Sequence, residues 1–236
     1  MNVWVKLGIG LGTLAILAAL PSMGSAADAA HPAVVELFQS QGCSSCPPAA
    51  ASVQAISGRP DILALSFAVD YWDRLGWKDT FSKHAWTERQ YAYARAMGGG
   101  DVYTPQVVVN GRTAGAGAEP KELAALVSRG DRGAGGPAVA FAGGAVTVGS
   151  GSAPPAGADV WLARYDPRTI EVAVQRGENA GRTLPHKNVV RDLVLLGRWR
   201  GDAASFALPP RSEAGLAEAA IVQTVGAGPI LAAARN

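Results

Sequence analysis

In the first half of the chain, short apolar runs alternate with longer helix-forming stretches. Residues 34–38 and 62–69 are apolar runs of strand length that contain β-branched side chains. Each run is followed by a stretch of helix-forming composition, at residues 49–56 and 82–97. Three consecutive glycines end the second stretch, because glycine is a poor helix former. The pattern predicts two strand–helix units whose strands are buried in a sheet.

A hairpin and a further helix follow these units. An Asn110-Gly111 pair joins the segments at residues 106–110 and 113–115, and Asn-Gly favours the tight turn of a β-hairpin. Pro120 lies where the next helix would begin, since proline fits the first helical turn. The predicted order is therefore β-α-β-α-β-β-α, which is typical of an α/β domain.

After a glycine-rich boundary at residues 130–137, short apolar runs alternate with turn residues. The strand-length runs are residues 139–141, 145–148, 160–163, 170–174, 189–199, 206–208 and 220–225. Many short strands with frequent turns are typical of an antiparallel β-sandwich. We therefore expect an α/β domain at residues 32–129, followed by a mostly antiparallel, sandwich-like β domain at residues 137–236.

The first residues of the chain are typical of a targeting segment. Lys6 supplies a positive charge, residues 7–20 form an apolar run, and the small residues at 24–27 suit a signal peptidase. The alternative is a membrane anchor, but the apolar run is shorter than the ~20 residues needed to cross a bilayer. We expect residues 1–26 to be a cleaved signal peptide. The mature protein would then be periplasmic or secreted, without stable membrane insertion.

Composition excludes some classes of partner. The formal net charge is +2, and charged residues make up only 17% of the chain. No block of like charge occurs in the sequence, so nothing indicates binding to nucleic acid or to a membrane surface. Hydrophobic residues make up 48% of the chain, which is enough to bury a sizeable core.

Cys43 and Cys46, the only two cysteines, lie between the first predicted strand and the first predicted helix. Disulfide exchange needs a cysteine whose thiol pKa is lowered. The start of a helix lowers it, because the free N–H groups and the helix dipole favour negative charge. In this interpretation Cys43 is the exposed attacking thiol, and Cys46 resolves the mixed disulfide.

Two other interpretations of the cysteine pair stay open. One is a permanent structural bond, although closing so small a loop stabilises the fold by only about 2 kcal/mol. The other is half of a metal site, for which His31, His84 and His186 are the additional ligands on offer. A redox-active pair explains the spacing best, and it needs no cofactor and no metal.

Residues 34 to about 129 resemble the thioredoxin superfamily. The likeness rests on the strand before Cys43-Ser44-Ser45-Cys46, the acid Glu36, the segment Val102-Tyr103-Thr104-Pro105-Gln106 and the hairpin at Asn110-Gly111. More narrowly, the whole chain resembles a family of exported bacterial and plant proteins known only as a domain of unknown function. That likeness rests on residues 42–47, 70–73, 104–106, 176–179 and 188–191.

The resemblance implies roles for individual residues. Thr104 and Pro105 correspond to a cis-proline loop that faces the cysteines. With Pro105 in the cis form, the Thr104 backbone would be free to pair with a substrate peptide. Glu36 corresponds to a buried acid that could relay a proton to Cys46. The alternative for Glu36 is a solvent-facing position on its strand.

Two further polar segments have an open assignment. Tyr71 and Trp72 follow the second predicted strand, where they form either a substrate wall or a loop packed under the next helix. Residues 176–179, with the sequence Arg-Gly-Glu-Asn, lie in a predicted turn of the second half. They either reach the cysteines as a functional loop or form a structural network of hydrogen bonds and ion pairs.

Taken together, the sequence predicts an exported enzyme, a protein thiol–disulfide oxidoreductase. Cys43 and Cys46 exchange disulfides, Thr104 and Pro105 present a protein thiol or disulfide substrate, and Glu36 assists proton transfer.

Two alternative functions belong to other classes. One is a copper-handling thioredoxin-like protein that adds His186 or His84 to the cysteine pair. The other is an interaction module, in which the β domain binds a partner and the cysteines have no role.

Overall fold

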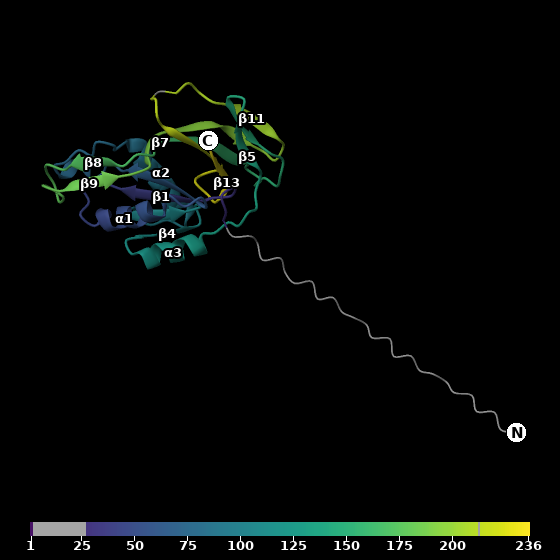
Figure 1. Ribbon diagram of the computed structural model, residues 1–236, viewed down its shortest axis with the longest axis horizontal. Coiled ribbons are helices and arrows are strands. Elements are labelled where there is room, and N and C mark those ends of the chain that lie inside the picture. The colour runs from purple at the N-terminus through teal and green to yellow at the C-terminus, as the bar shows by residue number, and fades with distance from the viewer. Residues whose placement is uncertain (2–26, 212) are drawn as a thin grey trace.

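The computed structural model describes residues 1, 27–211 and 213–236 (Figure 1). The expected signal peptide, apart from its first residue, lies outside the described residues. In the described part of the chain, no helix is long and apolar enough to cross a membrane. The chain is a mixed α/β protein in which a few helices accompany one large β-sheet.

The first half has the element order expected from its sequence. Its elements are β1 (Ala33–Gln39), α1 (Cys46–Ile56), β2 (Ile62–Ala68), the short 3-10 helix η1 (Asp73–Leu75), α2 (His84–Ala96), β3 (Gln106–Val109), β4 (Thr113–Gly115) and α3 (Pro120–Arg129). β1 pairs in parallel with β2 and antiparallel with β3, and β3 pairs antiparallel with β4. Asn110 and Gly111 have positive φ angles of 49° and 61°, which a tight Asn-Gly turn requires. The predicted hairpin is confirmed.

β1 is buried because helices cover both faces of the sheet. Val35 and Leu37 pack with α1 and α3, whereas Val34 and Phe38 pack with α2 on the other face. Successive side chains of a strand point to opposite faces. Glu36 therefore shares the α2 face with Val34 and Phe38, and this decides its surroundings.

The second half extends the same sheet. Its strands are β5 (Val139–Ala142), β6 (Ala145–Val148), β7 (Ala158–Asp166), β8 (Ile170–Ala173), β9 (Thr183–His186), β10 (Val189–Trp199), β11 (Ala204–Ala207), β12 (Ala217–Thr224) and β13 (Ile230–Arg235). The resulting eight-stranded sheet has the order β13-β12-β7-β10-β2-β1-β3-β4. The segments expected as two domains thus share one continuous sheet.

The junction of the two halves lies between β2 and β10. The strands pair in parallel at Val189 and Ser66. The preceding Asn188 has a positive φ of 52°, and its side-chain amide donates to the carbonyl of Ala64 at 2.9 Å. The Asn188 carbonyl accepts from the Ser66 N–H at 2.9 Å. Strand-forming composition alone does not indicate which neighbour a strand will choose, so the sequence pattern could not reveal this junction.

Two smaller sheets complete the second half. A three-stranded sheet of order β11-β6-β5 packs on part of the large sheet, with Val146, Trp199 and Val222 in the core between them. The two packed layers of the expected sandwich are therefore this three-stranded sheet and part of the large sheet. β8 and β9 form a separate hairpin beside α1, where the Gln54 side-chain amide donates to the Pro185 carbonyl at 3.0 Å.

Candidate functional site

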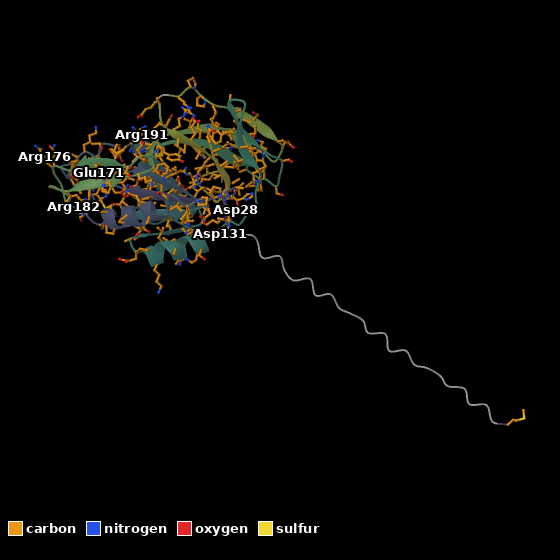
Figure 2. All side chains as sticks on the ribbon, viewed as in Figure 1. Asp28, Asp131, Glu171, Arg176, Arg182 and Arg191 are labelled. Carbon is orange, nitrogen blue, oxygen red and sulfur yellow. A yellow bond between two sulfur atoms is a disulfide. The ribbon has the colours of Figure 1, made fainter. Side chains whose placement is uncertain are left out.

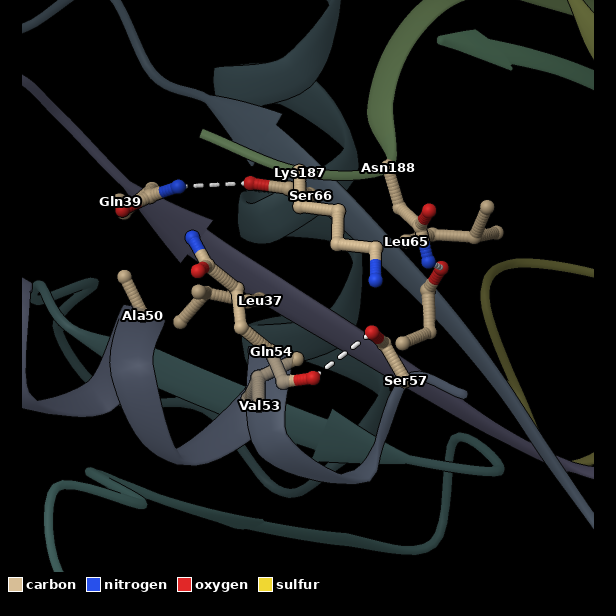
Figure 3. A pocket seen from close by; sticks show the side chains of 11 residues that line it. Leu37, Gln39, Ala50, Val53, Gln54, Ser57, Leu65, Ser66, Lys187 and Asn188 are labelled. Carbon is tan, nitrogen blue, oxygen red and sulfur yellow. Dashed lines mark hydrogen bonds between the residues drawn. The ribbon is translucent and has the colours of Figure 1, made fainter. Parts of the chain in front are cut away.

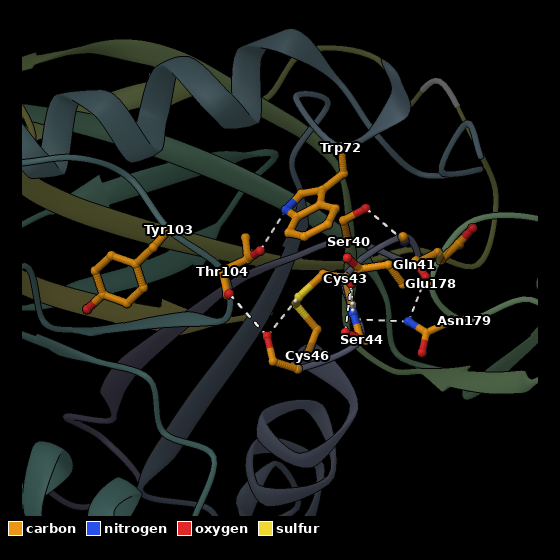
Figure 4. Close-up of a disulfide and its surroundings, with 12 residues drawn as sticks. Ser40, Gln41, Cys43, Ser44, Cys46, Trp72, Tyr103, Thr104, Glu178 and Asn179 are labelled. Atoms are coloured by element: carbon orange, nitrogen blue, oxygen red, sulfur yellow. Dashed lines mark hydrogen bonds between the residues drawn. A yellow bond between two sulfur atoms is a disulfide. The ribbon is translucent and has the colours of Figure 1, made fainter. Parts of the chain in front are cut away.

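Cys43 and Cys46 form a disulfide between β1 and α1, with a distance of 2.16 Å between the sulfur atoms (Figure 4). α1 begins at Cys46, earlier than its composition predicts, and Ser45 is its N-cap residue. Pro47 and Pro48 are tolerated there, because the N–H groups of a first helical turn have no partner within the helix. Cys43 therefore precedes the helix, and Cys46 lies in its first turn.

Both cysteines are buried, with exposed fractions of 0% for Cys43 and 1% for Cys46. The expectation of an exposed Cys43 is wrong; its neighbour Ser44 is exposed instead. Tertiary contacts cover the motif. The Cβ atom of Trp72 lies only 3.5 Å from the position that a Cβ atom on Gly42 would occupy.

The loop at residues 176–179, which we call the clamp loop, reaches the cysteine motif from the β8–β9 hairpin (Figure 4). The Glu178 carboxylate accepts hydrogen bonds from the backbone N–H of Ser44 at 3.0 Å and from its hydroxyl at 2.7 Å. The buried Asn179 side chain donates to the carbonyls of Gln41 and Cys43, both at 2.9 Å. The segment therefore reaches the cysteines, and it does so through a network of hydrogen bonds, so the structure combines the contact of the first interpretation with the network of the second.

The clamp loop also brings charge to the disulfide. The hydrogen bonds from Ser44 lower the pKa of Glu178, so that its carboxylate is ionised at neutral pH. This anion lies at the N-terminal side of α1, where a helix favours negative charge. Arg182 donates to the Asn179 side-chain oxygen at 2.7 Å. Arg176 and Arg182 lie toward the outer end of the hairpin (Figure 2).

The loop that precedes β3 also contacts the cysteine motif. The peptide bond between Thr104 and Pro105 is cis, as the resemblance implied. The Ser45 hydroxyl oxygen lies 3.4 Å from the Thr104 carbonyl oxygen and 3.4 Å from the Cys43 sulfur. The Trp72 indole N–H donates to the Thr104 hydroxyl at 2.7 Å. The structure thus brings Thr104, Pro105 and Trp72 to the cysteines.

Tyr71 supports this loop from behind. Its hydroxyl donates to the Gln90 side chain at 3.3 Å, and the Gln90 amide donates to the Tyr103 carbonyl at 2.7 Å. Burial raises the pKa of Tyr71 to about 12, so the phenol is neutral at physiological pH. Tyr71 therefore positions the loop from the side of α2, whereas Trp72 contacts Thr104 directly.

Glu36 lies apart from the cysteines. It is fully buried on the α2 face, where Arg89 donates to its two carboxylate oxygens at 2.8 and 3.1 Å. The Tyr93 hydroxyl also donates to it, and Gln223 bonds to both Arg89 and Tyr93. Because α1 covers the opposite face of β1, no hydrogen bond among the described residues joins Glu36 to Cys46. Glu36 is therefore not solvent-facing, and it lies on the face of β1 opposite to the one that α1 covers.

The histidines considered as metal ligands lie in different places. His84 and His31 are paired with carboxylates outside the site. His186 shares a pocket of about 40 Å³ with Cys46. Across residues 27–211 and 213–236, no group of three or more His, Cys, Asp or Glu side chains could hold a metal ion.

A second crevice lies along α1, between the helix and Lys187 (Figure 3). Its volume is about 10 Å³, which is room for about one water molecule. Gln39 lines this crevice and the pocket of His186, and its amide donates to the Ser66 hydroxyl at 2.7 Å. Neither space is large enough for an organic substrate, since ligand pockets occupy roughly 300–1,000 Å³.

Side chains that the sequence analysis did not single out hold the chain just before Cys43. The buried Asp79 carboxylate accepts from the backbone N–H groups of Gln41 at 2.7 Å and Phe81 at 2.8 Å. The Gln41 side chain accepts from the Trp77 indole at 2.9 Å. Burial raises the pKa of Asp79 to about 6. The only signal in the sequence was an acid just after the aromatic segment, which is not specific.

Comparison with solved structures identifies a similar protein. The crystal structure of protein AGR_C_4864 from Agrobacterium tumefaciens is 34% identical in sequence to this chain, with a TM-score of 0.70. The similarity covers 86% of this chain and 92% of that chain. No curated protein matches the chain.

The comparison with protein families covers both halves of the molecule. Residues 34–225 match the family described as "Protein of unknown function (DUF1223)". The matched segment includes the cysteine motif, the Thr104–Pro105 loop, the junction at Asn188 and the clamp loop. The chain therefore belongs to the DUF1223 family.

Proposed function

We propose that the protein is an exported thiol–disulfide oxidoreductase with a thioredoxin-like first half. The observation that carries the proposal is the Cys43–Cys46 disulfide in contact with the loop of a cis-proline, Pro105. The order of helices and strands from β1 to α3, with helices on both faces of the sheet, supports the thioredoxin-like assignment.

When Cys43 and Cys46 form a disulfide, the protein can oxidise a dithiol of its substrate. A substrate thiolate attacks the Cys43 sulfur, the bond between Cys43 and Cys46 breaks, and its electron pair goes to Cys46. A second substrate thiolate then attacks the mixed disulfide and releases Cys43. The substrate gains a disulfide, and the protein becomes a dithiol. The same steps in reverse reduce a substrate disulfide.

We propose that substrate access involves movement of the clamp loop, because both cysteines are buried and the loop is hydrogen-bonded to Ser44 and to the carbonyl of Cys43. Opening breaks the two hydrogen bonds of Glu178 to Ser44 and the two of Asn179 to main-chain carbonyls. Neutral hydrogen bonds are each worth about 1 kcal/mol net and those to a charged group about 1.5–3 kcal/mol, so opening is within the reach of substrate binding. We propose protein thiols as the substrates, with the exposed Tyr103 beside the opened site as an anchor.

Export follows from the same proposal. Disulfides persist in oxidising compartments, and a disulfide between the only two cysteines is consistent with the signal peptide expected at residues 1–26. Expression of the full chain in a Gram-negative host, followed by fractionation and N-terminal sequencing, tests this. A protein that keeps its first residues and stays in the cytoplasm would overturn it.

A redox titration of residues 27–236, combined with an insulin-reduction assay, tests the activity. We expect a potential well above about −300 mV and activity that is lost in Cys43→Ala and Cys46→Ala. A reduction potential far below that value, together with no reduction of insulin, would show that the disulfide is structural and would overturn the proposal.

A soft-metal titration of the reduced protein tests the copper alternative. Stoichiometric binding without turnover would favour that function instead.

A further inference from the structure

The small pocket beside the disulfide contains two reactive side chains that come from distant parts of the chain. Cys46 lines it from the first turn of α1, and His186 lines it from the end of β9. The remaining lining residues are apolar or neutral, so no other ionisable side chain faces the pocket. Cys46, whose sulfur is bonded to Cys43, and His186 thus line one space of about 40 Å³.

His186 is buried, with an exposed fraction of 4%, and its Nε2 atom has no hydrogen-bond partner in the described part of the chain. Buried polar side-chain atoms are rarely left without a partner. The ring itself is held in place, because it packs edge-on against Phe81 with the ring centroids 5.5 Å apart. The structure therefore fixes the imidazole and leaves Nε2 free.

The charged groups around His186 lie outside the pocket. On the β8 side, Glu171 is paired in register with Pro185 and is exposed. The Arg191 guanidinium lies over the Phe81 ring at 4.7 Å from its centroid, and Lys187 follows His186 along the chain. α1 has no acidic residue in its first turn. With no anion against the ring, burial lowers the pKa of His186 to about 4, so the ring is neutral at pH 7.

We infer that His186 is the proton acceptor for Cys46 during disulfide exchange, an inference that rests on the proposed function. In the resolving step, the Cys46 thiol gives its proton to Nε2 of His186, and the Cys46 thiolate attacks Cys43 in the mixed disulfide. The bond between Cys43 and Cys46 forms, and the substrate thiolate leaves with the electron pair. The imidazolium then passes its proton to solvent or to that leaving thiolate.

This assignment solves a physical difficulty of the buried site. A thiolate at Cys46 has almost no access to water, and a buried anion without a counter-ion is strongly disfavoured. An imidazolium formed in the same pocket supplies that counter-ion, and the thiolate in turn stabilises the imidazolium. Glu36 cannot serve, because Arg89 and Tyr93 hold its carboxylate on the opposite face of β1.

The experiment follows the reaction of reduced protein with Ellman's reagent, 5,5′-dithiobis(2-nitrobenzoate), in a stopped-flow instrument. The first release of nitrothiobenzoate reports attack by Cys43, and the second reports resolution by Cys46. In His186→Gln we expect the second release to slow by about 100-fold, while the rate of the first release is unchanged. The rate of the second release should then rise steeply with pH. His84→Gln, a histidine on the protein surface, is the matched control and keeps both rates.

Equal second-release rates and pH profiles in the wild-type protein and His186→Gln would overturn the inference. The proposed function fails separately, when the wild-type protein itself shows no second release and no insulin reduction. If His186→Gln does not fold, NMR titration of the reduced wild-type protein decides. We expect the His186 titration to be coupled to that of Cys46 and to change in Cys46→Ser, and identical titrations would overturn the inference.

Discussion

Two buried polar sites lie on opposite faces of β1, and they are built in different ways. On the α2 face, Glu36, Arg89 and Tyr93 bond to one another and to Gln223. On the α1 face, His186 lies in a pocket with Cys46, and its Nε2 has no partner among the described residues. A satisfied network stabilises and specifies a fold, whereas an unsatisfied buried group costs stability. The comparison separates a structural acid from a base that is available for chemistry.

The largest expected effect comes from breaking the satisfied network. Arg89→Met leaves the Glu36 carboxylate buried without its counter-ion, and removing one partner of a buried pair costs about 3–5 kcal/mol. Urea unfolding monitored by tryptophan fluorescence measures the loss. Arg95→Met, at an exposed position on the same helix, is the control and should stay close to wild type. An unfolding free energy of Arg89→Met close to that of wild type would show that the ion pair of Arg89 and Glu36 does not stabilise the fold.

The second prediction uses the opposite site. The folded-state pKa of His186, about 4, lies below the ordinary value of 6.5. The unfolded chain therefore takes up a proton at higher pH than the folded chain, and stability is lost as pH falls from 6.5 to 4. His186→Phe removes this loss. The variant should gain about 3 kcal/mol in unfolding free energy relative to wild type between pH 7 and pH 4.

Because wild type and His186→Phe are compared at the same pH, their difference in unfolding free energy does not contain the contribution of the buried Asp79. The raised pKa of Asp79, about 6, makes the folded state more stable as pH falls through that range. This opposite contribution is present in both proteins and cancels in the comparison. A difference between His186→Phe and wild type that stays constant from pH 7 to pH 4 would contradict the prediction.

A third, smaller effect is expected at the clamp loop. Asn179→Ala removes the two hydrogen bonds to the carbonyls of Gln41 and Cys43, and leaves Arg182 without its acceptor. Unsatisfied buried groups cost about 1–3 kcal/mol, so we expect a loss near the middle of that range. The disulfide should also react faster with dithiothreitol, because the loop opens more often. Unchanged reduction kinetics would show that the loop does not control access.

The smallest effect is expected for the exposed Glu178, whose charge lies beside the disulfide. Glu178→Gln removes negative charge where an attacking thiolate must approach, while keeping an oxygen that can accept from Ser44. We expect reduction by dithiothreitol to accelerate by about threefold at low salt, and this gain to shrink at high salt. Glu171→Gln on the same hairpin is the control. A gain that does not depend on salt would exclude the electrostatic cause.

Much of the first half could be predicted from local patterns. The strand of residues 34–38, the Asn110-Gly111 hairpin and the helix from Pro120 follow from hydrophobic periodicity and turn chemistry, and each is present. The segment at residues 176–179 was predicted to lie in a turn, and the sequence left open whether it reaches the cysteines. Its contact with Ser44 spans 134 residues of chain, and no local pattern encodes a partner at that distance.

The sequence by itself determined which side chains are available: one cysteine pair at a helix start, one proline loop, and buried strands on which alternate residues face opposite sides. The tertiary structure decided which of them meet. α1 covers one face of β1 and α2 covers the other, so Glu36 is separated from the cysteines. Pairing of β10 with β2 anchors the chain just after β9, and the β8–β9 hairpin beside α1 brings His186 and the clamp loop to the disulfide. The physical reason is that packing and strand pairing are long-range choices, whereas propensity and turn chemistry act over a few residues.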